Sequence, residues 1–301
     1  TRRSSDLSPE SGARYTKGWF KVTPGYYLQQ GKYEDGDDFW YYADGNGKIY
    51  ANEIKTINGK KYAFDNYGRM KSGLKFIVME PTGTGAGTTY SSSKIVEVIA
   101  NDSDAWGHYE TEEEFDAFVN KYADQINSGE MRAYFFGGGE DGSMKTGKQT
   151  ISLDGEDFAF EFEKSGAVKG AGKNGLIEKD DKLYMAGKLV KADKDDKYTV
   201  YAVVPAKNSS NKVIEMDIEE YLSFCNTTTD GLSKSQIEDG DMKWVIDRTK
   251  VDAADSEFKN AKFYLVNSAG KVIKDKSSAK DGNDYKFEVK NREIKSVILE
   301  G

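Results

Sequence analysis

The stretch YYADGNGKIYAN (residues 41–52) recurs 21 residues later as YAFDNYGRMKSG (residues 62–73), and this repetition indicates a repeat protein. Both copies begin with aromatic residues, continue into an Asp-x-x-Gly turn and carry one apolar residue two positions after the glycine. Self-similarity at a short fixed period is typical of repeat proteins, in which each unit packs on the next. The superposed pairs are Tyr41/Tyr62, Asp44/Asp65, Gly47/Gly68 and Ile49/Met70.

Two further copies of this unit lie downstream, between residues 134 and 170. The third copy is displaced by 74 residues from the second, and the fourth by a further 24 residues. A single overlay can arise by chance, but three overlays in the same register indicate a repeat. The third copy places Gly142 and Met144 on Gly68 and Met70, the fourth places Gly166 and Val168 on Gly142 and Met144, and weaker echoes occur at residues 184–192 and 263–274.

Each copy has the pattern of a β-hairpin. Alternating rings such as Tyr62 and Phe64 put one face of the first strand inward. The turn glycine then supplies a positive φ, which reverses the chain. A lone hairpin is only marginally stable in water, so the copies must stack and share a core. The sequence therefore predicts a mainly β fold of stacked β-hairpin repeats that is β-solenoid-like.

The third copy contains GSMKTGK (residues 142–148), which has the G-x-x-x-x-G-K spacing of a phosphate-binding loop. The next residue is Gln149, whereas such a loop needs a Ser or Thr hydroxyl for Mg²⁺. A phosphate loop also starts a helix, but residues 149–162 have the pattern of strand, turn and strand. We therefore interpret this stretch as a hairpin turn, and the sequence predicts no cofactor.

Composition narrows the function classes. The formal charge of −8 and the lack of a basic stripe argue against nucleic acid as a partner. One His and one Cys exclude an intramolecular disulfide and a Cys-based zinc site, and no metal site is predicted. No apolar run approaches the ~20 residues of a membrane span, so no membrane insertion is expected. Residues 1–17 are polar without a signal-peptide core, as in a cytoplasmic chain or a trimmed piece of a longer protein.

The repeats resemble the cell-wall-binding repeat family of Gram-positive bacteria, which includes choline-binding and glucan-binding repeats. This resemblance implies a secreted, extracellular and cell-wall-associated attachment module without catalytic residues. Its implied partner is a cell-wall polymer or glycan, such as teichoic acid or a polysaccharide. The stretches that carry the resemblance are GWF (18–20), FWYYADGNGKIY (39–50), NGKKYAFDNYGRMKSGL (58–74), EDGSMKTGKQ (140–149) and DGEDFAFEFEKSGAVKG (154–170).

The choline-binding members of the family place a quaternary ammonium among aromatic faces of successive hairpins. Each ring attracts the cation by ~0.5–2 kcal/mol, depending on desolvation. Trp19, Trp40 and Tyr42 stand in the matching positions here, so the resemblance implies that they form the ligand platform. The alternative is that these rings only pack the first hairpins together, as large aromatic residues commonly do.

The later copies depart from the choline-binding pattern. Where Trp40 and Tyr42 stand in the first copy, the second copy has Lys61 and Ala63. A lysine at that position repels a cation, so we expect at most one such site, and choline specificity is doubtful.

An inserted segment (residues 76–133) separates the second copy from the third. It starts with two strand-like stretches, FIVME (76–80) and KIVEVIA (94–100), around a Gly/Ser/Thr-rich loop. A helix is then predicted over residues 111–129, where Thr111 and Glu114 match a capping box. Its apolar residues recur at spacings of three and four, which predicts one amphipathic helix that packs on the β-structure.

The loop NDSDAWGHYE (residues 101–110) precedes this helix and contains Trp106. Trp106 is a candidate sugar-stacking platform, and the neighbouring carboxylates with His108 are a weaker candidate for a metal site. The alternative is an acidic surface loop whose tryptophan anchors the start of the helix.

Beyond residue 197 the repeat pattern fades. YTVYAVV (198–204) predicts a strand, residues 215–225 a short helix that includes a buried Cys225, and residues 259–275 and 285–299 two hairpins. The expected organisation is a polar tail (1–17), N-terminal hairpin repeats (18–75), the inserted strand, loop and helix segment (76–133), further hairpin repeats (134–197) and a β-rich C-terminal subdomain (198–301).

Catalysis has little support in this sequence. A thiol mechanism would need Cys225 beside His108, and neither neighbourhood indicates a dyad. The acidic residues fall mostly among lysines in turns, which is a solvated setting. We therefore expect a non-catalytic surface module that binds its ligand through exposed aromatic residues. The alternative is a structural spacer or a protein-interaction module, with a protein partner on the host or bacterial surface and no small-ligand site.

Overall fold

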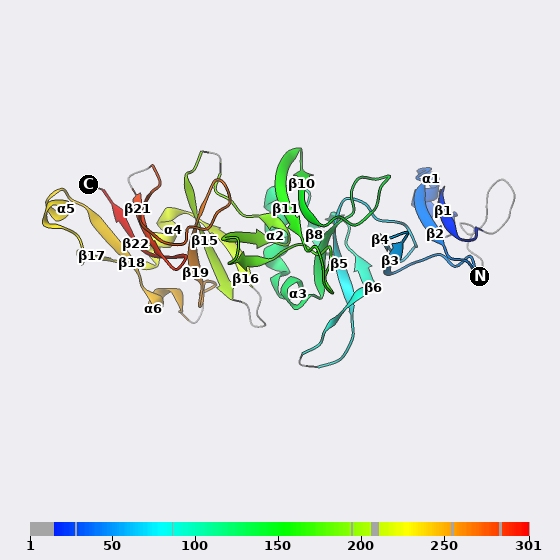
Figure 1. Cartoon of the computed structure of the whole chain (residues 1–301), viewed down its shortest axis with the longest axis horizontal. Helices are drawn as coiled ribbons and strands as arrows, with labels where there is room; N and C mark the ends of the chain where they lie inside the picture. The colour runs from blue at the N-terminus through cyan, green and yellow to red at the C-terminus, as the bar shows by residue number, and fades with distance from the viewer. Residues whose placement is uncertain are drawn as a thin grey trace. The chain divides into compact units, whose positions relative to one another are not determined.

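The computed structural model is mainly β and contains several antiparallel sheets (Figure 1). It describes residues 15–27, 29–85, 87–193, 195–205, 211–253, 256–282 and 285–300. The chain divides into two compact units, each assembled from segments that are separate in the sequence. The first comprises residues 1–110, 129–151 and 162–172, and the second residues 111–128, 152–161 and 173–301. The predicted segment boundaries, which follow the sequence, stay a prediction.

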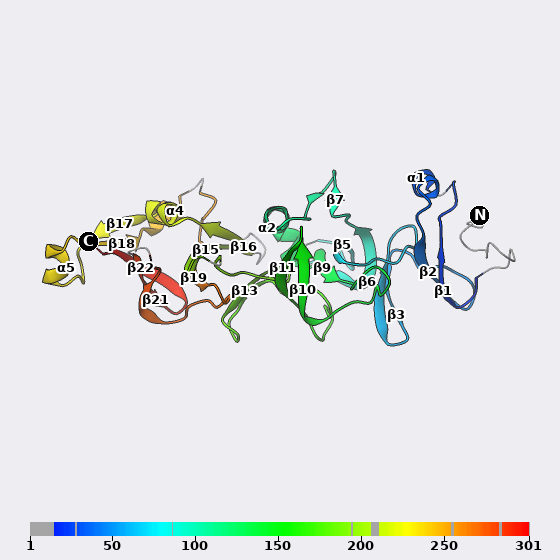
Figure 2. The same cartoon turned by 90° about the horizontal axis from the view of Figure 1, so that it is seen from above.

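The described residues of the first unit include three sheets and a short helix. β1 (Gly18–Val22) pairs with β2 (Phe39–Ala43), and the two lie side by side in Figures 1 and 2. Helix α1 (Gln30–Glu34) lies between them in the sequence, and β7 (Asp102–Ser103) pairs with β8 (Gly107–His108). The largest sheet has the order β4 (Lys60–Phe64), β3 (Glu53–Ile57), β6 (Tyr90–Val98), β5 (Leu74–Pro81), β9 (Met131–Phe135).

The turns of the first two copies have the same hydrogen bonds. The Gly47 amide donates to the Asp44 carbonyl at 2.9 Å, and the Gly68 amide donates to the Asp65 carbonyl at 2.9 Å. Both glycines have a positive φ, of 71° and 81°, as the Asp-x-x-Gly pattern predicts. Isolated bridges join Ala43 to Ile49 and Phe64 to Met70, and the same pattern joins Val266 to Val272.

Successive copies contact each other at the turn glycines. A Cβ placed on Gly68 would lie 2.7 Å from Cγ2 of Ile49, the apolar residue of the first copy. A Cβ on Gly142 would overlap the thioether of Met70, the apolar residue of the second copy. The repeat therefore needs glycine here for two reasons, because the φ is positive and the apolar side chain of the preceding copy lies against the backbone.

The fourth copy lies in a different register from the one predicted. Gly170, not Gly166, lies against Met144, and nothing lies within 4 Å of a Cβ on Gly166. Val168, expected in the core, is 41% exposed. The chain makes an additional turn at residues 165–169 before it re-enters the sheet, so the prediction was wrong by four residues.

Residues 147–162 form a hairpin, as predicted. β10 (Gly147–Leu153) is followed by a turn at Asp154 and Gly155, both with positive φ, and by β11 (Glu156–Phe162). Because Lys148 lies in a strand, the stretch GSMKTGK does not lead into a helix, and its resemblance to a phosphate-binding loop is limited to spacing.

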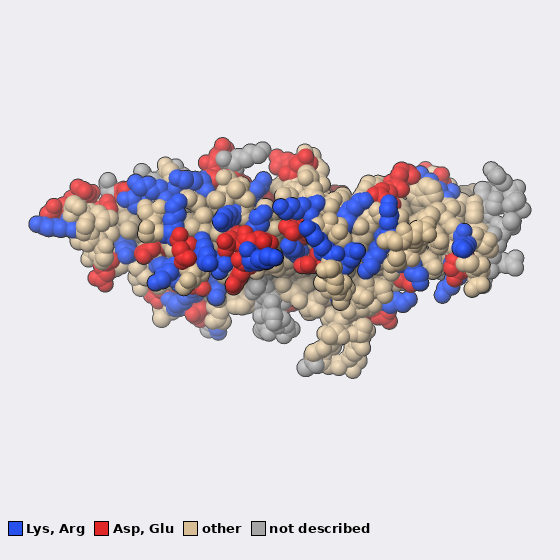
Figure 3. Space-filling model, in the orientation of Figure 1, with Lys and Arg blue, Asp and Glu red and all other residues tan. Residues whose placement is uncertain are grey.

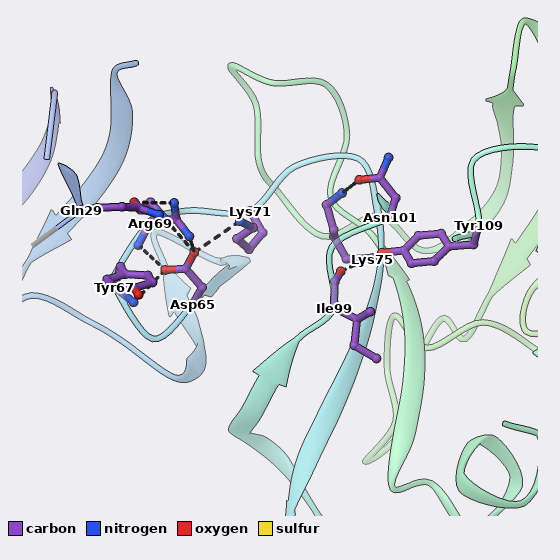
Figure 4. Close-up of polar contacts among 9 residues, drawn as sticks. All are labelled: Gln29, Asp65, Tyr67, Arg69, Lys71, Lys75, Ile99, Asn101 and Tyr109. Carbon is purple, nitrogen blue, oxygen red and sulfur yellow. Dashed lines mark hydrogen bonds and ion pairs between the residues drawn. The ribbon is translucent and has the colours of Figure 1, made fainter. Parts of the chain in front are cut away.

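The turn of the second copy is fixed by Asp65, which is only 4% exposed (Figure 4). Its Oδ1 accepts hydrogen bonds from the amides of Tyr67 and Arg69 at 2.9 and 3.0 Å. Its Oδ2 accepts from Arg69 Nε at 2.8 Å and from Lys71 Nζ at 3.3 Å. One carboxylate therefore orders the turn and neutralises two partly buried cations.

The second unit contains the predicted amphipathic helix in two pieces. α2 (Glu112–Lys121) starts with the predicted capping box, since both bonds between Thr111 and Glu114 are present. α3 (Ala123–Ser128) continues it after a break at Tyr122. The apolar stripe faces the protein, and Phe115 packs edge-on against Phe160 at 5.5 Å between ring centroids.

Two sheets make up most of the remainder. A five-stranded sheet has the order β10, β11, β14 (Lys188–Leu189), β13 (Lys182–Met185), β12 (Gly175–Ile177). The other sheet has the path β16 (Asn211–Met216), β15 (Tyr198–Pro205), β19 (Lys262–Asn267), β22 (Glu293–Leu299), β18 (Met242–Ile246), β17 (Cys225–Thr228). β20 (Lys276–Lys280) pairs with β21 (Tyr285–Lys290), which pairs with β22, and Figure 2 shows β17, β18 and β22 together.

The short helices of the second unit differ in part from the prediction. α4 (Ile218–Ser223) covers only the middle of the predicted helix at 215–225, and α5 (Lys234–Glu238) and α6 (Arg248–Val251) were not predicted. Cys225 is buried, as expected, but it begins β17 and lies outside the helix. Burial raises the pKa of its thiol to about 11, so the thiol is protonated at neutral pH.

Within the described residues, no helix is long and apolar enough to span a membrane. Lys and Arg side chains are interspersed with Asp and Glu over the face that Figure 3 shows.

Candidate functional site

The pairing of β1 with β2 puts two tryptophans on one face. In this ladder Trp19 lies opposite Tyr42, and Lys21 lies opposite Trp40. Because side chains alternate along a strand, these four residues share a face. The opposite face is the core of the hairpin, formed by buried residues that include Phe20, Tyr41 and Ala43.

Trp19 lies at the centre of an aromatic cluster. Its ring is edge-on to Trp40, with 6.4 Å between centroids, and to Tyr42, with 5.1 Å. Tyr62 and Phe64 of β4 approach it at 4.7 and 5.9 Å. The first and second copies therefore share this cluster, and it is built from the strands that carry the repeat.

A cavity of about 240 Å³ opens beside the cluster, which is large enough for a single sugar ring or a small organic cation. Its apolar wall comes from the first two copies and its polar wall from the turn of the third. The lining residues are Trp19, Trp40, Tyr62, Met70, Glu140 and Asp141.

Both carboxylates of the cavity have cationic partners. Glu140 accepts hydrogen bonds from Trp40 Nε1 at 2.8 Å and from Lys21 Nζ at 2.9 Å. The bond from Lys21, followed by that from Trp40, lowers the pKa of Glu140 below its ordinary value. Asp141 forms an ion pair with Lys145 and accepts a hydrogen bond from Ser143 Oγ at 2.6 Å. These contacts lower the pKa of Asp141 as well, with the Lys145 bond the larger cause.

The structure brings together part of the platform predicted from the sequence. Trp19 and Trp40 line the cavity, and Tyr42 contacts Trp19 without lining the cavity. Trp106 lies elsewhere in the first unit, between β7 and β8, where its Nε1 donates to Glu97 Oε1 at 3.2 Å. Its role as a sugar platform stays a prediction. Among the described residues, no group of three or more His, Cys, Asp or Glu side chains could hold a metal ion.

Sequence comparison of the copies missed Tyr62, Met70, Glu140 and Asp141. Lys61 is the residue of the second copy that is equivalent to Trp40, but the aromatic ring that lines the cavity belongs to the next residue, Tyr62. Glu140 lies 100 residues after Trp40, and Asp141 is the next residue, so only the turn preceding Gly142 hinted at them. An acidic pair next to a repeat turn is the signal that could have found them.

A larger cavity of about 640 Å³ lies in the second unit, and it is predominantly acidic. At its edge the buried Lys188 forms ion pairs with Glu112 at 2.7 Å and with Asp116 at 2.6 Å. Burial raises the pKa of Asp116, and burial also raises that of Glu215, with nearby acids adding to the effect. The lining residues are Glu112, Glu113, Asp116, Glu156, Phe158, Met185, Lys188, Leu189, Val190, Lys191, Asp193, Asp195, Tyr201 and Glu215.

The buried Lys188 of this second cavity stabilises the packing of a helix on a sheet. Lys188 is on β14 and its partners are on α2, so the ion pairs attach the helix to the sheet. The aromatic cavity of the first unit combines three aromatic rings with hydrogen-bonding groups, whereas acidic side chains predominate among the described residues that line the second cavity. The aromatic cavity is therefore the better candidate for function.

Comparison with known proteins gives distant similarities only. No protein-family model and no curated protein matches the chain. The structure of CbpF in complex with ipratropium is 14% identical, with 94% of this chain and 49% of that chain covered and a TM-score of 0.39. This chain thus spans about half the length of that protein.

Two further solved structures come from Streptococcus pneumoniae. The modular autolysin LytC is 13% identical, with 68% of this chain and 35% of that chain covered and a TM-score of 0.19. Choline binding protein F is 15% identical, with 85% and 83% covered and a TM-score of 0.17. These similarities are too low to carry an argument, so the function is argued from the site.

Proposed function

We propose that this chain is a non-catalytic bacterial surface module that binds a cell-wall polymer or glycan in the aromatic cavity of its first unit. The observation that carries the proposal is the cavity itself, in which Trp19, Trp40 and Tyr62 face two carboxylates. Aromatic faces stack on the apolar faces of sugar rings, and carboxylates accept hydrogen bonds from hydroxyl groups. The proposed location is extracellular, at the cell wall.

The assembly of the cavity supports a repeat scaffold as its basis. Its residues come from three successive copies, and the copies contact one another through Ile49 with Gly68 and Met70 with Gly142. We propose that these contacts continue as a β-solenoid-like stack, in which each new hairpin adds one wall to a site begun by the previous one.

The proposal that the module is non-catalytic rests on the chemistry of the cavity. Both carboxylates of the cavity are paired with lysines and have lowered pKa values, which is unsuited to a general acid at neutral pH. The alternative function is a structural spacer or protein-interaction module, in which the rings only pack the hairpins together.

Retention on purified Gram-positive cell walls tests the proposal. Trp40→Ala removes one wall of the cavity, while Trp19 stays in place against Tyr62 and Phe64. Trp106→Ala is the matched control, because it removes a half-buried tryptophan of the same unit outside the cavity. We expect retention of the parent chain and of Trp106→Ala, and loss of retention for Trp40→Ala.

Other outcomes discriminate between the alternatives. Equal retention of both variants would contradict the cavity as the binding site. Loss of retention only in Trp106→Ala would move the platform to the loop between β7 and β8. No retention of the parent chain on any wall preparation would favour the spacer or protein-interaction module. Circular dichroism of each variant shows whether the fold is intact.

A further inference from the structure

The aromatic cavity has a balanced charge, although its lining contains two carboxylates. Lys21 lies 2.9 Å from Glu140, and Lys145 forms an ion pair with Asp141. Each negative charge that faces the cavity is therefore matched by a lysine at the edge of the cavity. A charge-balanced aromatic cavity does not have the negative potential that draws an organic cation between rings.

Lys21 is placed by the strand register. It lies directly opposite Trp40 in the β1–β2 ladder, so its side chain emerges on the same face as that ring. Its Nζ is 5.9 Å from the centroid of the Trp40 ring, within cation–π range. An ammonium group of the chain itself thus already contacts both the ring and the carboxylate that an external cation would use.

Glu140 is fixed between two donors. The Trp40 indole donates to Oε2 and Lys21 donates to Oε1, so both oxygens of the carboxylate are engaged. Because the indole bond is independent of Lys21, removal of the lysine charge leaves Glu140 positioned at the cavity with its negative charge unmatched. Lys21 is therefore the cationic partner of Glu140, whose side chain is 73% exposed at the edge of the cavity.

We propose that Lys21 determines the specificity of the cavity, by neutralising Glu140 so that uncharged sugar-like ligands are accepted and simple organic cations are rejected. This inference rests on the proposed function, since it names the ligand class of the same cavity. Lys21 acts as a built-in competitor for a cation, and a neutral glycan hydroxyl does not compete with it for the ring.

Titration with tetramethylammonium tests the inference through tryptophan fluorescence and calorimetry. Lys21→Met keeps the length of the side chain and removes its charge, and we expect it to bind this cation about tenfold more tightly than the parent chain, or more. Lys21→Arg keeps the charge and should behave as the parent chain. The double variant with Lys21→Met and Glu140→Gln should lose the gain, because the unmatched carboxylate is gone.

Lys55→Met is the matched control. Its Nζ lies 4.7 Å from the centroid of the Tyr50 ring, so it also removes a lysine over an aromatic ring, outside the cavity. Equal affinity of Lys21→Met and the parent chain for the cation, with both proteins folded, would overturn the inference. An equal gain in Lys55→Met would overturn it too, because the effect would then not be local.

The result of the tetramethylammonium titration is independent of the result of the cell-wall retention experiment. Retention on cell walls concerns the polymer, whereas the tetramethylammonium titration concerns only the charge of the cavity. A gain in cation affinity with no wall retention would sustain the role of Lys21 and remove the wall-binding proposal. Wall retention without any gain would remove the role of Lys21 and leave wall binding in place.

Discussion

The backbone amide of Met70 donates a hydrogen bond to the carbonyl of Trp40 at 2.8 Å. The amide of Met144 donates to the carbonyl of Lys61, also at 2.8 Å. Trp40 and Lys61 are equivalent positions of the first and second copies, and Met70 and Met144 are equivalent positions of the second and third. The second and third copies are therefore each bonded to the copy before them in the same way, and this link places Met70 against the aromatic cavity.

The contact between copies predicts the stability of glycine variants. In Gly68→Ala the methyl group would meet Ile49 Cγ2 in addition to the strain of a positive φ. We expect a loss of about 2–4 kcal/mol in the free energy of unfolding, from backbone strain plus overpacking. Gly59→Ala is the control, since Gly59 has a φ of +80° and open space around its Cβ position, and should lose only about 1–2 kcal/mol. Denaturant unfolding measures both, and equal losses would argue against a contact between the copies.

The buried carboxylate of Asp65 predicts that substitutions of two equivalent aspartates differ in their effect on the free energy of unfolding. Asp65→Asn keeps an acceptor for the turn amides but leaves Arg69 and Lys71 without their anion, so we expect a loss of about 2–4 kcal/mol. Asp44→Asn is the matched control in the first copy, where Oδ1 accepts from two turn amides. It should lose less than about 1 kcal/mol. The chain itself has Asn267 in an equivalent turn. Thermal unfolding of the two variants gives the comparison, and a larger loss in Asp44→Asn would refute it.

The buried Lys75 predicts how stability changes with pH (Figure 4). Burial, with the nearby Lys71 adding to it, lowers the pKa of Lys75 to about 8. Between that value and the unfolded value near 10.5, the unfolded chain binds more protons than the folded chain, so the free energy of unfolding rises with pH. Below pH 8 both states are protonated and the folded state carries the full penalty.

The measurement compares the parent chain with Lys75→Met by urea unfolding at pH 8.0 and 9.5. The parent chain should gain roughly 1.5 kcal/mol relative to the variant over this range. Parallel stability curves would mean that Lys75 remains charged in the folded protein. Tyrosines of the unfolded chain, whose ordinary pKa is near 10, are already partly ionised at pH 9.5, and comparison with Lys75→Met cancels their contribution because both proteins have the same tyrosines.

The ion pairs of Lys188 predict that substitutions of Lys188 and Asp116 have non-additive effects on the free energy of unfolding. Lys188→Met removes the cation from two partly exposed acids on α2, so we expect a loss of about 1–3 kcal/mol. Adding Asp116→Asn should recover part of that loss, because burial already raises the pKa of this carboxyl. Hydrogen exchange over residues 112–121 reports the local effect. An additive result for the double variant would show that the two side chains do not interact.

The sequence predicted local features better than the assembly of the site. The turns at Gly47 and Gly68 and the capping box at Thr111 follow from short-range chemistry, and all are present. The register of the fourth copy failed because a glycine pattern alone does not tell a core turn at Gly170 from a surface turn at Gly166.

The cavity was predicted only in part, since its walls come from three copies. Trp19 and Trp40 could be found because they match a family motif, whereas Glu140 reaches Trp40 across 100 residues of sequence. A comparison of equivalent positions cannot predict such a contact. It depends on how the third hairpin packs on the second, and tertiary packing fixes that arrangement.

The indole N–H signals of the four tryptophans in NMR spectra test whether cell-wall polymer binds in the aromatic cavity. During titration with solubilised cell-wall polymer, we expect the signals of Trp19 and Trp40 to shift together, while those of Trp106 and Trp244 stay in place. Shifts confined to Trp106 or Trp244, or no shift at any polymer concentration, would contradict binding in the aromatic cavity.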